Sequence, residues 1–126
     1  MNKLTLKDSD FTPRIIFDYE KGQLDIRGKS MPDDANSFYD PLILWVEDYS
    51  KNPQPKTTVN LQFAYFNTST SKNVLEIFKR LVTLKELGND VVINWIYELD
   101  EEDMLEAGQD YQAIVKIPFN LIGYKR

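Results

Sequence analysis

Alternation of apolar and polar residues predicts a series of short β-strands in this chain. Residues 14–19 and 23–27 are predicted to form a hairpin, because the short connection between them ends in Gly22, and glycine tolerates the positive φ of a tight turn. Residues 57–66 show the clearest alternation. The predicted inward-facing residues of that strand are Val59, Leu61, Phe63 and Tyr65. Residues 90–98 are apolar almost throughout, which predicts a central strand covered on both faces.

Two further stretches repeat apolar residues at helical spacing. The first helix is predicted to be capped by Ser37 and to end before an Asn-Pro-Gln-Pro segment. Its apolar stripe consists of Phe38, Leu42, Trp45, Val46 and Tyr49. The second helix is predicted to begin near Thr70 or Ser71 and to run to about Leu87, where a Gly-Asn pair stops it.

The two ends of the chain complete the predicted fold. Residues 1–10 are predicted to be a flexible tail, which leaves residues 11–126 as a single domain. Residues 101–108 are predicted to form a short helix and residues 113–124 an extended segment. The element order predicts an α/β fold: a small sandwich with a mixed sheet of four to five strands and two main amphipathic helices packed on it.

The composition narrows the possible functions. The chain has 126 residues, with 20 acidic and 15 basic side chains, a net charge of −5, and neither Cys nor His. The absence of Cys and His excludes a disulfide framework, a thiolate nucleophile, a Ser-His-Asp triad and a Cys/His zinc site. An acidic chain without a Lys/Arg cluster is not expected to bind nucleic acid, because phosphate neutralisation supplies much of that affinity.

No stretch of the sequence predicts contact with a membrane. No apolar run approaches the roughly 18 residues that a membrane-spanning helix needs. Residues 1–11 lack the apolar core of a signal peptide. We therefore expect a cytoplasmic protein that does not insert into membranes, and the absence of Cys fits a reducing compartment.

Three candidate chemical sites have ordinary structural explanations. Residues 22–30 are similar to a phosphate-binding loop, but five residues separate the two glycines instead of four, and they alternate like a strand. The acidic cluster 98–106 lacks the spaced ligands of an EF-hand, and carboxylates in the first turn of a helix complement its dipole. No nucleophile–base arrangement accompanies the two carboxylate pairs, Asp18 with Asp25 and Asp33 with Asp34. We expect no catalytic residue, no metal site and no cofactor.

A polar segment between the clearest strand and the second helix is the strongest candidate for a functional site. Its candidate partner-binding residues are Asn67, Thr68, Ser69, Thr70, Ser71 and Lys72. Four consecutive hydroxyl residues exceed the need of a helix cap, for which one Ser or Thr suffices. A helix N-terminus has free N–H groups and partial positive charge, so a phosphorylated hydroxyl there suits the fold, whereas it would repel a docked partner of like charge. The same residues also fit a helix cap with no further role.

The chain resembles two kinds of regulatory protein. A strand followed by Asn or Asp, Ser or Thr, Ser and a helix resembles the phosphosite of STAS domains in anti-sigma factor antagonists. The resemblance to the SiaC family of bacterial regulatory phosphoproteins, which act in biofilm regulation, is closer and extends from about Phe11 to Tyr124. The matching segments are residues 12–18, 28–35, 38–42, 45–46, 65–69, 103–106 and 117–119.

The resemblance implies a STAS-like domain over residues 11–126 and a non-enzymatic partner switch. The family's phosphoacceptor is the Thr of an Asn-Thr-Ser motif, which corresponds to Thr68. Ser69 is the alternative acceptor, because Thr70-Ser71 stand where STAS antagonists often have glycine, and Asn67 replaces their usual Asp. A dedicated protein kinase and a PP2C-type phosphatase would add and remove the phosphate. The unphosphorylated protein would bind and activate a target, which for this family is a diguanylate cyclase that makes cyclic di-GMP. The loop 30–35 is expected to contribute to the docking surface.

Two other functions remain open on the sequence. A structural or oligomer-forming α/β module without a switch would expose a large apolar patch on one sheet face. A small enzyme based on Tyr or on a carboxylate pair would need a deep apolar pocket with converging polar groups.

Overall fold

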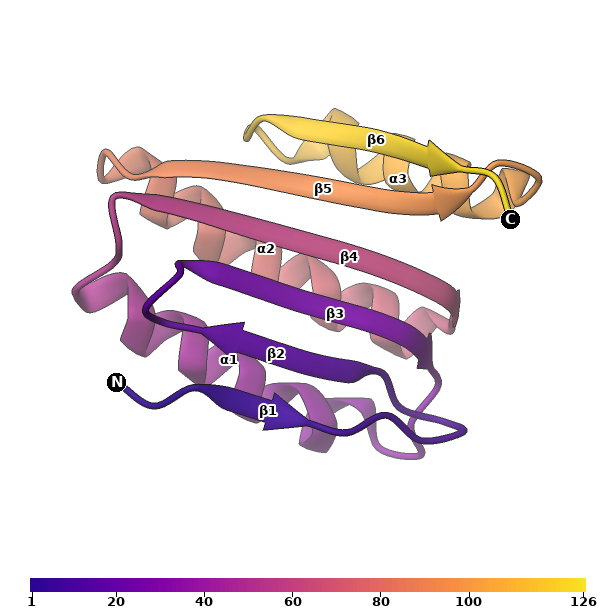
Figure 1. Ribbon diagram of the computed structural model, residues 1–126, viewed down its shortest axis with the longest axis horizontal. Coiled ribbons are helices and arrows are strands. Elements are labelled where there is room, and N and C mark those ends of the chain that lie inside the picture. Colours follow the sequence, from indigo (N-terminus) through magenta and orange to yellow (C-terminus); the bar gives the residue numbers. More distant parts are fainter.

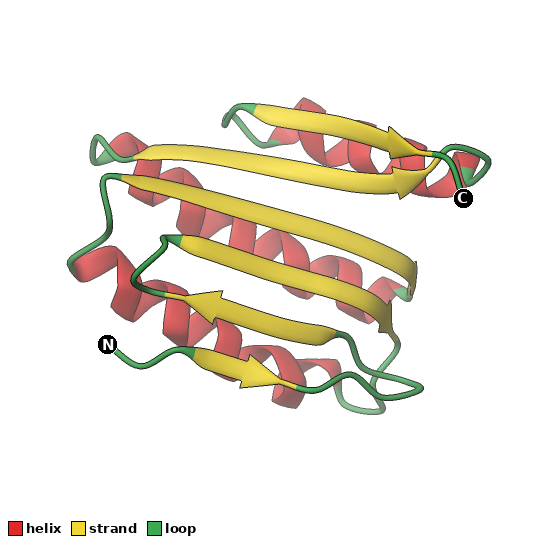
Figure 2. Ribbon diagram, in the orientation of Figure 1, coloured by secondary structure: helices red, strands yellow, loops and turns green.

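A six-stranded mixed sheet carries three helices on one of its faces, as Figures 1 and 2 show. The computed structural model describes all 126 residues. The elements in chain order are β1 (Leu4–Leu6), β2 (Arg14–Asp18), β3 (Gln23–Ser30), α1 (Ala35–Lys51), β4 (Lys56–Phe66), α2 (Thr68–Glu86), β5 (Asp90–Glu98), α3 (Glu102–Ile114) and β6 (Phe119–Tyr124). The predicted α/β sandwich is confirmed, with six strands instead of four to five; the two main helices and the predicted third helix are all present.

The strand order explains why the helices share one face. Strands β1 to β6 are neighbours in chain order; β1, β2 and β3 pair antiparallel, and β3 to β6 pair in parallel. Right-handed crossovers that all step in the same direction across a sheet place their helices on the same side. The opposite face, called the open face below, carries no helix (Figure 1). The prediction that residues 90–98 are covered on both faces is therefore wrong, and buried residues alternate with half-buried ones along β5.

The core lies between the sheet and the helix layer. Phe17 and Trp95 from the sheet meet Tyr39 and Tyr49 of α1 and Phe78 of α2, and all five are fully buried or nearly so. None of the helices is long and apolar enough to cross a membrane.

Strands β2 and β3 form the predicted hairpin. Gly22 adopts a φ of 61° in the turn between them. Residues 22–30 are thus a turn followed by a strand, as expected, and do not form a phosphate-binding loop.

Part of the predicted N-terminal tail belongs to the sheet. Leu4 and Leu6 in β1 lie opposite Phe17 and Ile15 in β2, and both leucines pack against the core. The indole of Trp45 donates a hydrogen bond to the carbonyl of Asn2 over 2.9 Å. A strand of three residues has too few positions to show a period, so the alternation pattern does not reveal it.

Helix α1 begins earlier than the sequence pattern predicts. Asp34, and not Ser37, caps it, because the Asp34 carboxylate accepts hydrogen bonds from the Ser37 hydroxyl at 2.8 Å and from the Ser37 backbone N–H at 3.2 Å. These two hydrogen bonds hold the pKa of Asp34 below its usual value. The cap is therefore fully formed at neutral pH and weakens as the pH falls through that lowered pKa.

A β-bulge near the end of β4 reverses the predicted alternation. The register pairs Gly28 with Phe63 and then Lys29 with Tyr65, so Ala64 is an extra residue. Tyr65, predicted to face the core, is 52% exposed, whereas Phe66 turns inward and lies 5.1 Å from the ring of Phe63. The bulge therefore determines how the chain enters α2.

Helix α3 is longer than the predicted helix 101–108. It runs on to Ile114, and the extended C-terminal segment is confined to β6. Glycine is a common helix terminator, but Gly108 lies inside α3, where its Cα faces Trp95. A Cβ at this position would lie 2.5 Å from the Cδ1 atom of Trp95. The glycine serves close packing of helix on sheet, and the indole of Trp95 also donates to the carbonyl of Met104 at 2.9 Å.

The open face carries a ladder of amide side chains across four strands. Asn60 donates to Asp25 at 2.8 Å, Asn94 donates to Asn60 at 2.9 Å, and Asn120 donates to Asn94 at 3.0 Å. A carboxylate can only accept, so Asp25 determines the orientation of each amide in turn. This Asp/Asn ladder places polar groups in the middle of the open face.

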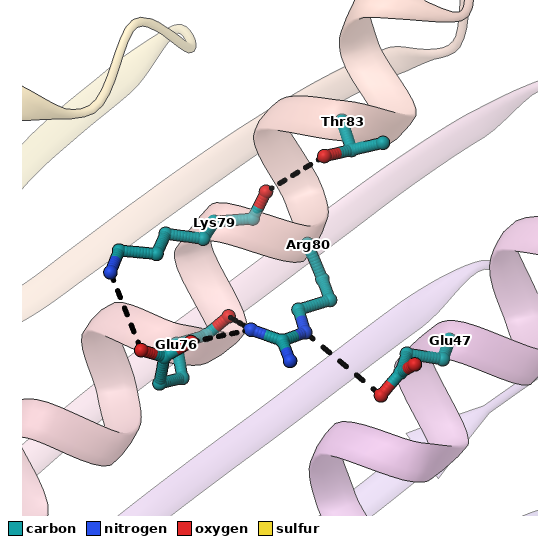
Figure 3. Close-up of polar contacts among 5 residues, drawn as sticks. All are labelled: Glu47, Glu76, Lys79, Arg80 and Thr83. Carbon is teal, nitrogen blue, oxygen red and sulfur yellow. Dashed lines mark hydrogen bonds and ion pairs between the residues drawn. The ribbon is translucent and has the colours of Figure 1, made fainter.

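A group of charged side chains joins α1 to α2 on the outer surface of the helix layer (Figure 3). Arg80 contacts Glu76 on its own helix and Glu47 on α1, and Lys79 contacts Glu76 at 3.3 Å. Arg80 first, and then Lys79, hold the pKa of Glu76 below its usual value. These residues are half-buried or exposed on the surface, where water screens the charges, so each pair adds little stability. Lys79 and Arg80 are nevertheless both engaged by carboxylates of the same chain.

Candidate functional site

The predicted hydroxyl segment lies where β4 passes into α2, at the carboxyl end of the parallel strands. Asn67 is the N-cap of α2, and its Oδ1 atom accepts a hydrogen bond from the backbone N–H of Thr70 at 2.9 Å. The helix thus begins at Thr68, two residues before the predicted start. Thr68 occupies the first helical turn, where backbone N–H groups have no partner within the helix.

The four hydroxyl residues have different environments. Thr68 and Ser69 are exposed, and their hydroxyl groups make no hydrogen bond within the chain. Thr70 is fully buried, and its hydroxyl bonds to the Ser30 hydroxyl at 2.8 Å and donates to the Ser30 carbonyl at 3.0 Å. Ser71 is hydrogen-bonded to the hydroxyl of Tyr111 at 2.9 Å. Of the four, Thr68 and Ser69 are therefore the two whose side chains are exposed and whose hydroxyl groups are free of hydrogen bonds within the chain.

Burial of Thr70 ties α2 to the end of β3 and to α1. The hydroxyl of Ser30 contacts that of Tyr39 at 2.6 Å, and both side chains are fully buried. Burial raises the pKa of Tyr39, so the phenol stays protonated and keeps its hydrogen bond. The three hydroxyls form a closed polar cluster in which each group has a partner.

We expect Thr70→Val to lower the free energy of unfolding by about 1–3 kcal/mol, because the change leaves buried oxygens of Ser30 one partner short. The matched control is Thr68→Val, the same change two residues earlier at an exposed hydroxyl, which should shift stability by less than about 0.5 kcal/mol. Denaturant unfolding followed by circular dichroism measures both. Equal losses in the two variants would contradict the assigned burial.

The loop 30–35 adjoins the hydroxyl segment. The backbone N–H of Asn67 donates to the carbonyl of Ser30 at 3.1 Å. Asn73 on α2 donates to Asn36 on α1 at 3.1 Å and to the Ser69 carbonyl at 2.9 Å. Asn73 therefore links the start of α1 to the first turn of α2.

A groove of about 430 Å³ lies between the start of α2 and the second half of α3. Its apolar wall residues are Phe66, Leu75, Ala107, Tyr111 and Ile114. Ile114 is 61% exposed. Its polar residues are Asn67, Thr68, Ser71, Lys72 and Asp110. Of the two accessible hydroxyl residues, Thr68 lines this groove and Ser69 does not.

The α3 wall of the groove was missed by the sequence reasoning. The predicted helix ends at Gly108, so the sequence pattern does not place Asp110, Tyr111 and Ile114 at the site. A helical stripe continues through Met104, Gly108, Tyr111 and Val115, at spacings of 4, 3 and 4 residues. Counting Gly108 as an inward-facing helical position would have revealed the longer helix.

The rejected carboxylate sites have structural partners. Asp18 lies 3.8 Å from Lys3, Asp25 accepts from Asn60, and Asp34 caps α1. Glu102 and Asp103 occupy the first turn of α3, where they complement its dipole. No group of three or more acidic side chains lies in a geometry that could hold a metal ion.

Comparisons with known proteins agree with one another. A family model described as SiaC family regulatory phosphoprotein matches residues 6–124. An uncharacterised protein of Pseudomonas aeruginosa (strain UCBPP-PA14) is 27% identical over 119 residues, which cover 94% of each chain. A solved structure of SiaC from Pseudomonas aeruginosa has a TM-score of 0.90 and 25% identity, covering 98% of this chain and 100% of that one. A second, of the diguanylate cyclase SiaD in complex with its activator SiaC, has a TM-score of 0.91 and 26% identity, covering 96% and 99%.

Proposed function

The chain belongs to the SiaC family of regulatory phosphoproteins, and from this we propose that it is a non-enzymatic partner switch in which phosphorylation of Thr68 controls docking. One observation carries the proposal: Thr68 is an exposed, unengaged hydroxyl at the margin of an apolar groove. Thr70 and Ser71 are held by hydrogen bonds inside the protein. Ser69 is the alternative acceptor, because it is also exposed.

The target we propose is a diguanylate cyclase. SiaC of Pseudomonas aeruginosa, 26% identical over 96% of this chain, is the activator of such an enzyme and forms a complex with it. The docking surface of this chain would be the groove and the segment Asn67–Lys72, with the loop 30–35 beside them. An apolar groove with an exposed Ile114 suits burial against another protein chain.

The physical basis of the switch is a change of charge at one place. A phosphate brings about −1.5 to −2 charges at neutral pH. The dipole of α2 would favour it by about 0.3–1 kcal/mol, so the fold tolerates the modification. A partner that lies in the groove would meet a doubly charged group at its edge, and like charges brought together at an interface cost several kcal/mol. A dedicated kinase and a PP2C-type phosphatase would set the balance between the two forms.

The test begins with the acceptor. The protein is incubated with ATP and candidate kinases of its own organism, and the phosphate is located by mass spectrometry. We expect modification at Thr68, with Thr68→Ala abolishing it. Phosphate on Ser69 alone would move the switch by one residue, and phosphate confined to residues outside 68–71 would contradict the proposal.

Binding is then measured against the diguanylate cyclases of the same organism by calorimetry. We expect one of them to bind wild-type protein and Thr68→Ala with similar affinity, and phosphothreonine at position 68 to weaken that complex by about tenfold or more. The matched control carries phosphothreonine at the exposed position Thr5 on β1, at the opposite edge of the sheet from α3. Equal affinities of the phosphorylated and unphosphorylated forms would remove the electrostatic switch.

A further inference from the structure

The groove beside Thr68 has one cation and one anion at its margin, and neither has an ion-pair partner within the chain. Lys72 is exposed on α2, and Asp110 is exposed across the groove on α3. The other basic residues in the middle of α2 are engaged, since Lys79 and Arg80 both contact Glu76 (Figure 3). Unpaired charges at the edge of an apolar groove are available to a partner with complementary charges.

Lys72 also lies within reach of a phosphate on Thr68. The two residues are four positions apart on α2, so their side chains lie on the same face, one turn apart. An acidic group on the N-terminal member of such a pair and a lysine on the C-terminal member is the favourable orientation. The phosphate of Thr68 would therefore find its nearest counter-ion on its own helix.

The direction of the switch distinguishes the two marginal charges. A partner cation facing Asp110 would be attracted more strongly once a phosphate is present, which would tighten the complex. A partner carboxylate facing Lys72 would lose its counter-ion to the phosphate and would then face excess negative charge. Only the second contact is broken by phosphorylation.

We propose that Lys72 is the residue through which the phosphorylation state is transmitted to the partner. In the unphosphorylated protein Lys72 pairs with a carboxylate on a segment of the cyclase whose apolar side chains fill the groove between α2 and α3. In the phosphorylated protein the phosphate on Thr68 takes Lys72 and repels that carboxylate. The inference rests on the proposed function. It adds that the partner segment consists of apolar residues with an acidic residue beside them.

The first test is charge reversal without any change at Thr68. Binding of Lys72→Glu to the cyclase that wild-type protein binds should be weaker by about tenfold or more at low salt, with the difference shrinking as salt rises. Lys79→Glu is the matched control, because it makes the same change of net charge at an exposed position of the same helix outside the groove. It should bind within about twofold of wild type. Thermal unfolding checks that both variants are folded.

The second test needs no partner. Phosphothreonine is installed at position 68 by genetic-code expansion, and the phosphate is titrated by ³¹P NMR in wild type and in Lys72→Met. A nearby ammonium favours the dianion, so loss of Lys72 should raise the titration midpoint by about 0.3 in pH. Equal midpoints would show that the phosphate does not engage Lys72 and would overturn the inference.

The outcomes separate this inference from the proposed function. If phosphorylation releases the cyclase but Lys72→Glu binds it as tightly as wild type, Lys72 has no part in the switch and the proposed function stands. If no diguanylate cyclase binds the wild-type protein, the proposed function fails and this inference with it, whatever the ³¹P titration gives.

Discussion

Replacing Gly108 by alanine is expected to lower the free energy of unfolding by about 2–3 kcal/mol, although alanine is the better helix former by about 1 kcal/mol. The added Cβ would lie 2.5 Å from Cδ1 and 2.7 Å from Nε1 of Trp95, and 2.8 Å from Cδ2 of Leu121. Trp95 is almost fully buried and anchored to the Met104 carbonyl, so it has little room to move. Helix α3 must therefore shift away from the sheet.

Thermal and denaturant unfolding followed by circular dichroism measure this effect. The control is Gln109→Ala, at the next and exposed position of α3, which should change stability by less than about 0.5 kcal/mol. Because α3 forms one wall of the groove, Gly108→Ala should also weaken partner binding at temperatures where the variant is still folded. A gain in stability, as helix propensity alone would give, would contradict the close packing of Gly108 on Trp95.

Replacing Asn60 by aspartate should cost about 3 kcal/mol at pH 7, because it places a largely buried charge against the Asp25 carboxylate, with only the Asn94 amide to donate to it. Asn60 is 8% exposed, and its side-chain amide donates to Asp25 at 2.8 Å. The isosteric carboxylate removes this donor and brings two negative charges into contact. Lowering the pH should reduce the difference in the free energy of unfolding between the variant and wild type. The folded variant then gains a proton that relieves the repulsion, which stabilises it relative to its unfolded state.

Denaturant unfolding at several pH values between 3 and 7 measures this dependence. The control is Asn120→Asp at the exposed end of the same Asp/Asn ladder, where water solvates the new charge and the loss should stay below about 1 kcal/mol. A loss at Asn60 that is the same at pH 3 and pH 7 would show that repulsion across the ladder is not its cause.

Much of the fold follows from periodic patterns that lie within single elements. The strands 14–19, 23–27, 57–66 and 90–98 and both long helices appear close to their predicted bounds. The misses have local causes: β1 is too short to show a period, and Gly108 reads as a stop signal although it lies inside α3. The N-cap of α1 is Asp34 and not the predicted Ser37. Asp and Ser are about equally good N-cap residues, so residue type alone does not say which of the two positions caps the helix.

The candidate site was located from sequence, but its parts were not distinguished. The four hydroxyl residues 68–71 are chemically alike in the sequence. They differ only in burial and in their hydrogen-bond partners. Thr70 is withdrawn into the core by Ser30, which lies 40 residues away in the chain, and Ser71 is held by Tyr111, also 40 residues away. Contacts at such separations leave no trace in a local pattern.

The sequence by itself determined the α/β class, the absence of Cys and His chemistry, and the polar segment at the start of the second helix. These properties depend on composition and on the side-chain periods of regular structure, two residues in a strand and 3.6 in a helix. Only the tertiary structure decided that the helices share one face, that the bulge at Ala64 turns Tyr65 outward, and that α3 closes a groove beside Thr68. Those features depend on which distant segments pack together, because burial and hydrogen-bond partners are properties of neighbours in space.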